Sequence, residues 1–123
     1  EPDASLINTI VAQCEEGKPV VVHSGARNEL TIDAQLLGNF YGNLVREISV
    51  RVPLGKLVIC GGDTSSHTAR ALGITAVEMV GSYIHGAPLC RAYSIHDEID
   101  GMEMNFKGGQ VGPPEYFEVI KTI

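Results

Sequence analysis

The chain has 123 residues and a mass of 13.2 kDa, and 44% of its residues are hydrophobic and 20% charged. This length suits one domain, residues 1–123, and this composition suits a packed core rather than disorder. The net charge of −6 argues against nucleic acid or an anionic membrane as the main partner. No apolar run approaches the roughly 20 residues that cross a bilayer.

Cysteines and histidines are few and widely spaced along the chain. An odd number of cysteines does not indicate a disulfide framework, and neither residue type shows the spacing of metal ligands. We therefore expect reduced thiols, a cytoplasmic location and no metal site built from side chains of these two types. The residues are Cys14, Cys60, Cys90, His23, His67, His85 and His96.

The first predicted elements are a helix and a strand. Apolar residues recur with helical spacing over 3–16, with Asp3 or Ser5 as the cap and Gly17 at the end. The three valines from Val20 to Val22 then form a β-branched apolar run. Such a run is typical of a strand covered on both faces, as in a parallel sheet.

A second helix is predicted over 32–48, with Thr31 as its cap. Gly38 and Gly42 each weaken it by about 1 kcal/mol relative to Ala, but small residues four apart also allow a neighbour to approach closely. A buried strand follows over 57–60. It leads into two glycines and a short helix that ends before Gly73.

The last third of the chain predicts strands over 77–80 and 89–95, then a closing helix. Asp100-Gly101 is the dipeptide favoured in a two-residue hairpin turn. Two prolines at 113 and 114 begin the closing helix. Its side chains expected to point inward are Tyr116, Phe117, Val119 and Ile120.

Alternation of helices and buried strands predicts an α/β fold. We expect a three-layer sandwich, with a largely parallel or mixed central sheet and helices on both faces. The strands over 20–23 and 57–60 are expected at its centre. No linker or internal repeat divides the chain.

The strongest candidate site is the turn from Cys60 to Ser66, between a strand and a helix. Its two glycines allow close approach of a ligand to the backbone, and the helix directs its free N–H groups and positive dipole end at the turn. Asp63 or Thr64 is expected to cap the helix, and hydroxyl groups follow at 64–66. The alternative is an ordinary capped turn without a ligand. Neither the Walker loop nor the dinucleotide-binding fingerprint is present.

Two further loops are weaker candidates. The glycine-rich loop 107–112 carries Lys107, which suits a phosphate, although for this loop taken alone a plain surface connection is the favoured interpretation. His23 and Arg27 follow the first predicted strand, where Arg27 suits an anion. His23 is a candidate base or simply a hydrogen-bonded histidine.

Several of these segments resemble one family. Residues 57–74, LVICGGDTSSHTARALGI, resemble the signature of the C-terminal nucleotide-binding domain of the four-carbon acid sugar kinases. Residues 87–91 are similar to that family's Gly-Val-Pro-Trp segment, with Leu89 where Trp is common. Residues 107–112 and 116–117 resemble its closing Lys-Ser-Gly-Asn-Phe-Gly and Phe-Phe pattern. Gly108 replaces the Ser, and Gln110-Val111 replaces Asn-Phe.

The resemblance implies one half of a two-domain kinase that transfers phosphate from ATP, with Mg²⁺, to a sugar acid such as threonate or erythronate. The N-terminal domain of the same polypeptide would carry the substrate and most catalytic groups, and this chain would hold ATP. Carried over by motif, the phosphate contacts are Gly61, Gly62, Asp63 and Thr64, and Gly109 lines the nucleotide site. The chain alone is expected to be inactive, and its catalytic residues stay unassigned.

Two other functions stay open at this point. One is a stand-alone small-anion-binding or regulatory module without catalysis. The other is a structural domain that forms a homodimer through a face exposed by its missing partner.

Overall fold

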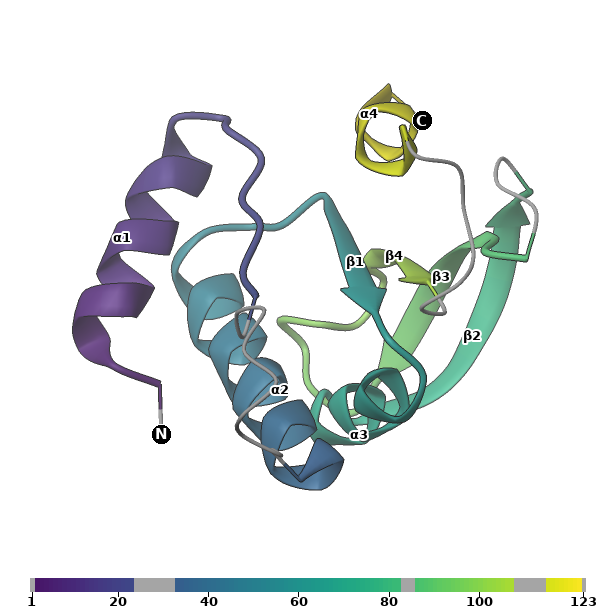
Figure 1. Ribbon diagram of the computed structural model, residues 1–123, viewed down its shortest axis with the longest axis horizontal. Coiled ribbons are helices and arrows are strands. Elements are labelled where there is room, and N and C mark those ends of the chain that lie inside the picture. Colours follow the sequence, from purple (N-terminus) through teal and green to yellow (C-terminus); the bar gives the residue numbers. More distant parts are fainter. Residues whose placement is uncertain (1, 24–32, 83–85, 108–114, 123) are drawn as a thin grey trace.

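A computed structural model describes residues 2–23, 33–82, 86–107 and 115–122 (Figure 1). This part of the chain contains four helices and four strands. None of these helices has both the length and the apolar character needed to cross a membrane. The elements are α1 (Ala4–Glu15), α2 (Ala34–Arg51), β1 (Lys56–Cys60), α3 (Asp63–Ala71), β2 (Ile74–Gly81), β3 (Leu89–Ser94), β4 (Glu103–Lys107) and α4 (Tyr116–Thr122).

The strands form one mixed sheet in the order β1-β4-β3-β2. β1 pairs with β4 in parallel, and β4–β3 and β3–β2 pair antiparallel. Neighbouring residues of β1 point to opposite faces: Ile59 packs in the cluster that includes Leu72, after α3, and Val58 packs against α4. Helices therefore cover both faces, as Figure 1 shows, and the predicted α/β sandwich with a mixed sheet is confirmed.

Three apolar clusters hold the described layers together, and the one that packs α4 against Val58 of β1 consists of Ala87, Tyr116 and Ile120. The central one joins the sheet to the end of α3 and the β3–β4 connection through Ile59, Leu72, Ala92, Ile99 and Met104. The second joins α1 to α2, on the far side of α2 from the sheet in Figure 1. Its buried residues are Ile7, Ile10, Leu44 and Ile48. α1 begins where predicted, because the Asp3 carboxylate accepts a hydrogen bond from the Ser5 amide at 3.0 Å.

The prediction of two central strands is wrong. Residues 20–23 are not a strand, and β1 lies at the edge of the sheet. Val20 and Val22 are partly buried against the α1–α2 cluster, and Val21 is 64% exposed. The valine run thus covers a pair of helices with alternate side chains instead of entering the sheet between two layers.

Two local predictions also differ from the structure. β3 and β4 are joined by residues 95–102 rather than by a two-residue turn, although Gly101 does take a positive φ of 86°. Ile99 and Met102 of this connection are buried in the central core, which a two-residue turn would not allow. In α4, Tyr116 and Ile120 point inward as expected, but Phe117 is 48% exposed because it lies on the outer side of this short helix.

The N-terminus of α2 lies slightly later than predicted. Asp33 caps it by accepting a hydrogen bond from the Gln35 amide at 2.9 Å. The expected cap, Thr31, lies outside the described residues.

The two glycines of α2 are where α3 approaches it. A Cβ built at Gly38 would lie 2.3 Å from the Cβ of His67, and one built at Gly42 would lie 2.3 Å from the Cβ of Ala71. No real pair of carbon atoms tolerates that separation without movement. The glycines are therefore packing residues, as their spacing of four indicates.

We expect Gly42→Ala to destabilise the protein. In an unobstructed helix this change stabilises by about 1 kcal/mol. Here the added methyl overpacks the α2–α3 contact, which typically costs about 1–3 kcal/mol. Chemical denaturation gives the free energy of unfolding. Ala71→Gly in the same chain should recover part of the loss, and Gly55→Ala, where a Cβ meets nothing within 4 Å, is the control. Greater stability of Gly42→Ala would contradict the close packing.

Candidate functional site

The turn between β1 and α3 has the geometry of a ligand-binding loop. β1 ends at Cys60, Gly61 has a φ of 106°, and Gly62 is the N-cap of α3. A φ in this range favours glycine strongly over other residues. Among the described residues, a Cβ built at Gly62 would meet nothing within 4 Å, so these residues leave the space beside this backbone open to a ligand.

The N-terminus of α3 lies open at this turn. Gly62 makes no side-chain cap, and the first N–H groups of a helix have no partner within the helix. Asp63 is exposed in the first turn of the helix. The prediction that Asp63 or Thr64 caps α3 is therefore wrong. The N-cap position falls on a glycine, which leaves the N–H groups for a ligand.

Hydroxyl groups of α3 stabilise the turn from within. Ser65 is 8% exposed, and its hydroxyl donates a hydrogen bond to the Gly61 carbonyl. Thr68 donates to the Thr64 carbonyl at 2.7 Å. Ser65 therefore holds the backbone of the turn. The sequence had indicated a hydroxyl directed at a ligand, and the structure directs it at the Gly61 carbonyl instead.

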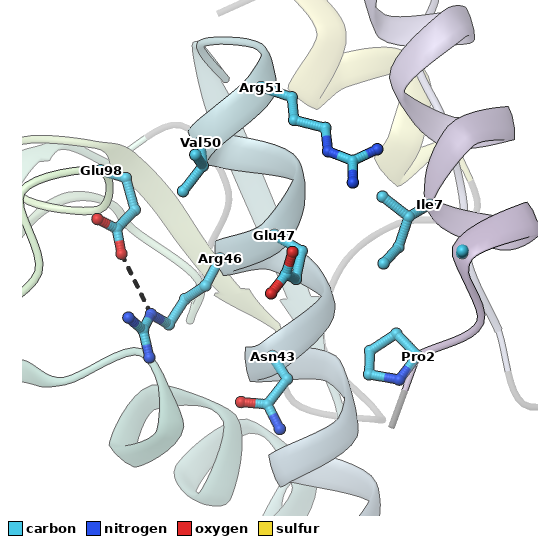
Figure 2. Close-up of a pocket in the computed structure, with 9 residues that line it drawn as sticks. Pro2, Ile7, Asn43, Arg46, Glu47, Val50, Arg51 and Glu98 are labelled. Carbon is cyan, nitrogen blue, oxygen red and sulfur yellow. Dashed lines mark hydrogen bonds and ion pairs between the residues drawn. The ribbon is translucent and has the colours of Figure 1, made fainter.

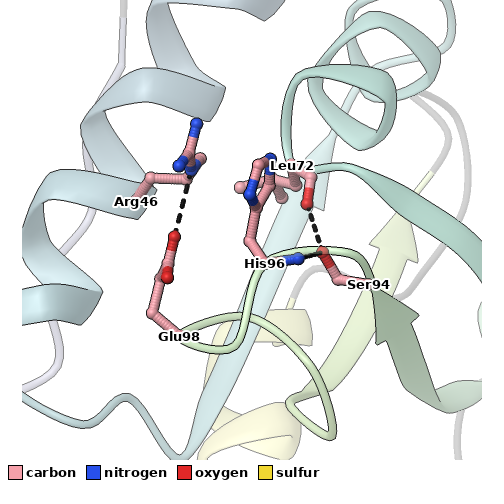
Figure 3. Close-up of polar contacts among 5 residues, drawn as sticks. All are labelled: Arg46, Leu72, Ser94, His96 and Glu98. Atoms are coloured by element: carbon pink, nitrogen blue, oxygen red, sulfur yellow. Dashed lines mark hydrogen bonds and ion pairs between the residues drawn. The ribbon is translucent and has the colours of Figure 1, made fainter.

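The other end of α3 is anchored to the β3–β4 connection (Figure 3). The Ser94 hydroxyl donates to the Leu72 carbonyl at 2.6 Å and accepts from the His96 amide at 3.0 Å. Gly73, with a φ of 68°, has the His96 ring against it. Arg46 of α2 pairs with Glu98 at 3.2 Å. With both ends fixed, α3 presents its N-terminus in a defined direction.

The end of β4 lies beside the turn. Cys60 and Lys107 are register partners in the parallel β1–β4 pair, and the Gly61 amide donates to the Lys107 carbonyl at 2.8 Å. The structure thus brings the start of the glycine-rich loop to the Gly61–Gly62 turn. Gly109, predicted to line the nucleotide site, lies outside the described residues.

Three titratable side chains meet at this edge of the sheet. The Lys107 ammonium lies 5.5 Å from the centroid of the Tyr116 ring. Cys60 is exposed as a residue, but partial burial of its thiol raises the pKa of that group, and the Lys107 charge acts in the opposite direction. Burial, followed by the nearby Cys60, raises the pKa of Tyr116 to about 12. Lys107 thus brings a basic side chain to this edge of the sheet, beside a thiol and a phenol whose pKa values are both raised.

Asn105 is a site-proximal residue that the sequence analysis missed. It is fully buried in β4 and hydrogen-bonds both to residues 87–88 and to the Tyr116 hydroxyl. The signal in the sequence was an amide residue placed between two apolar residues, Met104 and Phe106. A buried polar side chain requires partners, so such a residue predicts a specific contact.

The remaining candidates are His23 and Arg27. His23 is exposed and does not end a strand, so the argument that placed it at the carboxyl end of the sheet fails. Arg27 lies outside the described residues. Within the described ranges, no three His, Cys, Asp or Glu side chains are arranged to hold a metal ion.

A separate groove of about 440 Å³ lies between α1 and α2 (Figure 2). It is lined by residues of both charges, and its two arginines already have partners. Arg46 pairs with Glu98, and Arg51 donates to the Asn8 side chain at 2.8 Å. The groove therefore offers no free cluster of charge, whereas the Gly61–Gly62 turn presents an open helix N-terminus.

Comparison with known proteins shows the family to which the chain belongs. Residues 2–117 match the family described as the nucleotide-binding C-terminal domain. The chain belongs to this family. The resemblance to the C-terminal domain of four-carbon acid sugar kinases is thereby confirmed.

One curated relative is the 3-oxo-isoapionate kinase of Paraburkholderia graminis. It is 35% identical over 88 residues, which are 72% of this chain and 19% of that protein. Two crystal structures of a domain of unknown function from Bordetella bronchiseptica, domain-swapped dimers with bound citrate, share the fold. Their TM-scores are 0.71 and 0.67, with 20% and 22% identity over 95% of this chain and 29% of theirs. The chain spans less than a third of each of these proteins.

The buried Tyr116 predicts a dependence of stability on pH. Its pKa is about 12 in the folded chain, against an ordinary value of 10.0. Between these values the unfolded chain loses the proton and the folded chain keeps it, so the free energy of unfolding falls as pH rises from 10 to 12. Tyr116→Phe should flatten this fall in denaturation curves measured across that range. An equally steep fall in Tyr116→Phe would contradict it, and Tyr41→Phe is the control.

Proposed function

We propose that this chain is the ATP-binding domain of a kinase that phosphorylates a sugar acid of the four-carbon type. Gly61, Gly62, Asp63 and Thr64 hold the nucleotide phosphates, and Gly109 lines the nucleotide site. The observation that carries this proposal is the open backbone at Gly62 before the uncapped N-terminus of α3. A phosphate there accepts hydrogen bonds from the helix N–H groups and interacts favourably with the helix dipole.

The charges around the turn suit ATP with Mg²⁺. Mg²⁺ is commonly held by one or two carboxylates together with substrate phosphates and water. The exposed carboxylate of Asp63, next to the proposed phosphate position, fits this role. The Lys107 ammonium at the end of the adjacent strand adds positive charge for the phosphates. The metal would neutralise charge on the phosphates during transfer.

The acceptor site belongs, in this proposal, to an N-terminal domain of the same polypeptide. Phosphoryl transfer requires the acceptor hydroxyl in line with the γ-phosphate, and Asp63, the carboxylate at the turn, is assigned here to the metal rather than to the acceptor. The small share that the chain covers of its relatives supports a further domain. So does the outer strand β2, where Val77, Met79 and Val80 are 49%, 65% and 41% exposed. Partner contacts commonly bury such apolar surface. A homodimer is the alternative partner.

We expect Gly62→Val to lose nucleotide binding while it keeps the fold. The branched side chain has room in the ligand-free protein but occupies the space that the phosphates need. The affinity for Mg-ADP, measured by calorimetry on the complete natural polypeptide, should fall at least tenfold, or about 1.4 kcal/mol. Gly55→Val, also at an open position, is the matched control. Unchanged affinity in a folded Gly62→Val protein would refute the phosphate site.

The 123-residue chain alone should bind ATP weakly and phosphorylate nothing. It provides one side of the reaction site, and the acceptor is not positioned without the other side. The assay follows ADP release with threonate, erythronate and 3-oxo-isoapionate, for the chain alone and for the complete natural polypeptide. Acid-dependent turnover by the complete polypeptide only is the expected result. Turnover by the chain alone would overturn the two-domain proposal. Nucleotide binding without acid-dependent turnover in either protein would favour the anion-binding or regulatory alternative.

A further inference from the structure

Asn105 joins three segments of the chain at a fully buried position. Its amide donates to the Ala87 carbonyl at 2.7 Å and to the Pro88 carbonyl at 3.0 Å. Its side-chain oxygen accepts a hydrogen bond from the Tyr116 hydroxyl. One side chain of β4 therefore binds the segment before β3 and the first residue of α4, with both amide hydrogens used.

Two contacts connect this buried network to the phosphate turn, one between Tyr116 and Lys107 and one between Lys107 and Gly61. Asn105 and Lys107 are two residues apart in β4, so they lie on the same face of the sheet. Tyr116 contacts both of them, since its hydroxyl binds Asn105 and its ring lies 5.5 Å from the Lys107 ammonium. The Lys107 carbonyl in turn accepts from the Gly61 amide. If Tyr116 is displaced, the contact at the end of β4 changes, and this is the end to which the turn is hydrogen-bonded.

α4 does not depend on Asn105 alone for its attachment. Lys56, at the start of β1, donates to the Ile120 carbonyl at 3.3 Å, and Ile120 is buried in the cluster with Ala87. Loss of the Asn105–Tyr116 bond therefore leaves the far end of α4 in place and frees mainly the end near Lys107. An effect at the turn can thus be separated from loss of the fold.

We propose that Asn105 is a positioning residue for nucleotide phosphate binding, which acts through Tyr116 on Lys107 and the Gly61 end of the turn. This inference rests on the proposed function, because the phosphates are taken to bind at Gly61–Thr64. An apolar side chain would fill the same buried position without needing partners. An amide that satisfies three hydrogen bonds specifies the relative position of three segments.

The test is a double-mutant cycle on the complete natural polypeptide, with Asn105→Ala and Tyr116→Phe, singly and together. Tyr116→Phe keeps the aromatic ring and removes only the hydroxyl that holds it to Asn105. Each single variant should weaken Mg-ADP binding about tenfold. The double variant should also lose about tenfold rather than a hundredfold, because either change alone already breaks the Asn105–Tyr116 bond. Calorimetry at a temperature where circular dichroism shows every variant folded gives the affinities.

Two further variants separate the possible causes. Ile48→Val lowers stability from a remote cluster and should leave the affinity unchanged, which shows that lower stability by itself does not weaken binding. Gly62→Val reports on the phosphate site itself. Normal binding by Asn105→Ala and Tyr116→Phe, with loss in Gly62→Val, would overturn the role of Asn105 and keep the proposed function. Additive losses would overturn the action through Tyr116. Absence of Mg-ADP binding to the unchanged polypeptide would overturn both proposals.

Discussion

The close approach of α2 and α3 is the constraint on which the geometry of the phosphate turn depends. At Gly38 and Gly42 the absence of a side chain lets α3 lie against the α2 backbone. α3 begins directly at the turn, so its distance from α2 sets the position of its N-terminus relative to the sheet. The Ser94–Leu72 bond fixes the other end of the helix (Figure 3). A methyl group at Gly42 would therefore alter the site through the helix, without touching a ligand.

The local elements could be predicted from the sequence, whereas the partners of the strands could not. Helical spacing and caps gave α1, and the run over 57–60 gave β1, to within one or two residues. The valines at 20–22 show the limit of this reasoning. Their alternating burial indicates an extended chain, but the side chains pack on α1 and α2. The apolar composition of a segment predicts that it is buried. It does not predict which other element packs against it, because that depends on residues distant in the sequence.

In the candidate site, too, local features could be predicted from the sequence and contacts between distant residues could not. Two glycines between a strand and a helix predicted the turn, because positive φ and close approach are local requirements. The pairing of β1 with β4, which brings Lys107 to Gly61, is a contact between residues distant in sequence. Asn105 was missed because its importance comes from Ala87 and Tyr116, and neither partner is adjacent in sequence. The type of a residue indicates what chemistry it can perform, whereas the contacts that position it in the fold cannot be seen from that residue alone.

Ligand contact and backbone support are carried by different residues in this domain. The proposed phosphate contacts at Gly61 and Gly62 use the backbone, and Gly62 has open space where a side chain would be. The groups that hold this backbone are the buried Ser65 hydroxyl, the Lys107 carbonyl and, beyond it, Asn105. Binding energy at such a site depends on N–H groups already aimed at the ligand, since ordering them on binding would lower the affinity. A protein of this family could therefore keep the glycines and still bind nucleotide poorly if this support were lost.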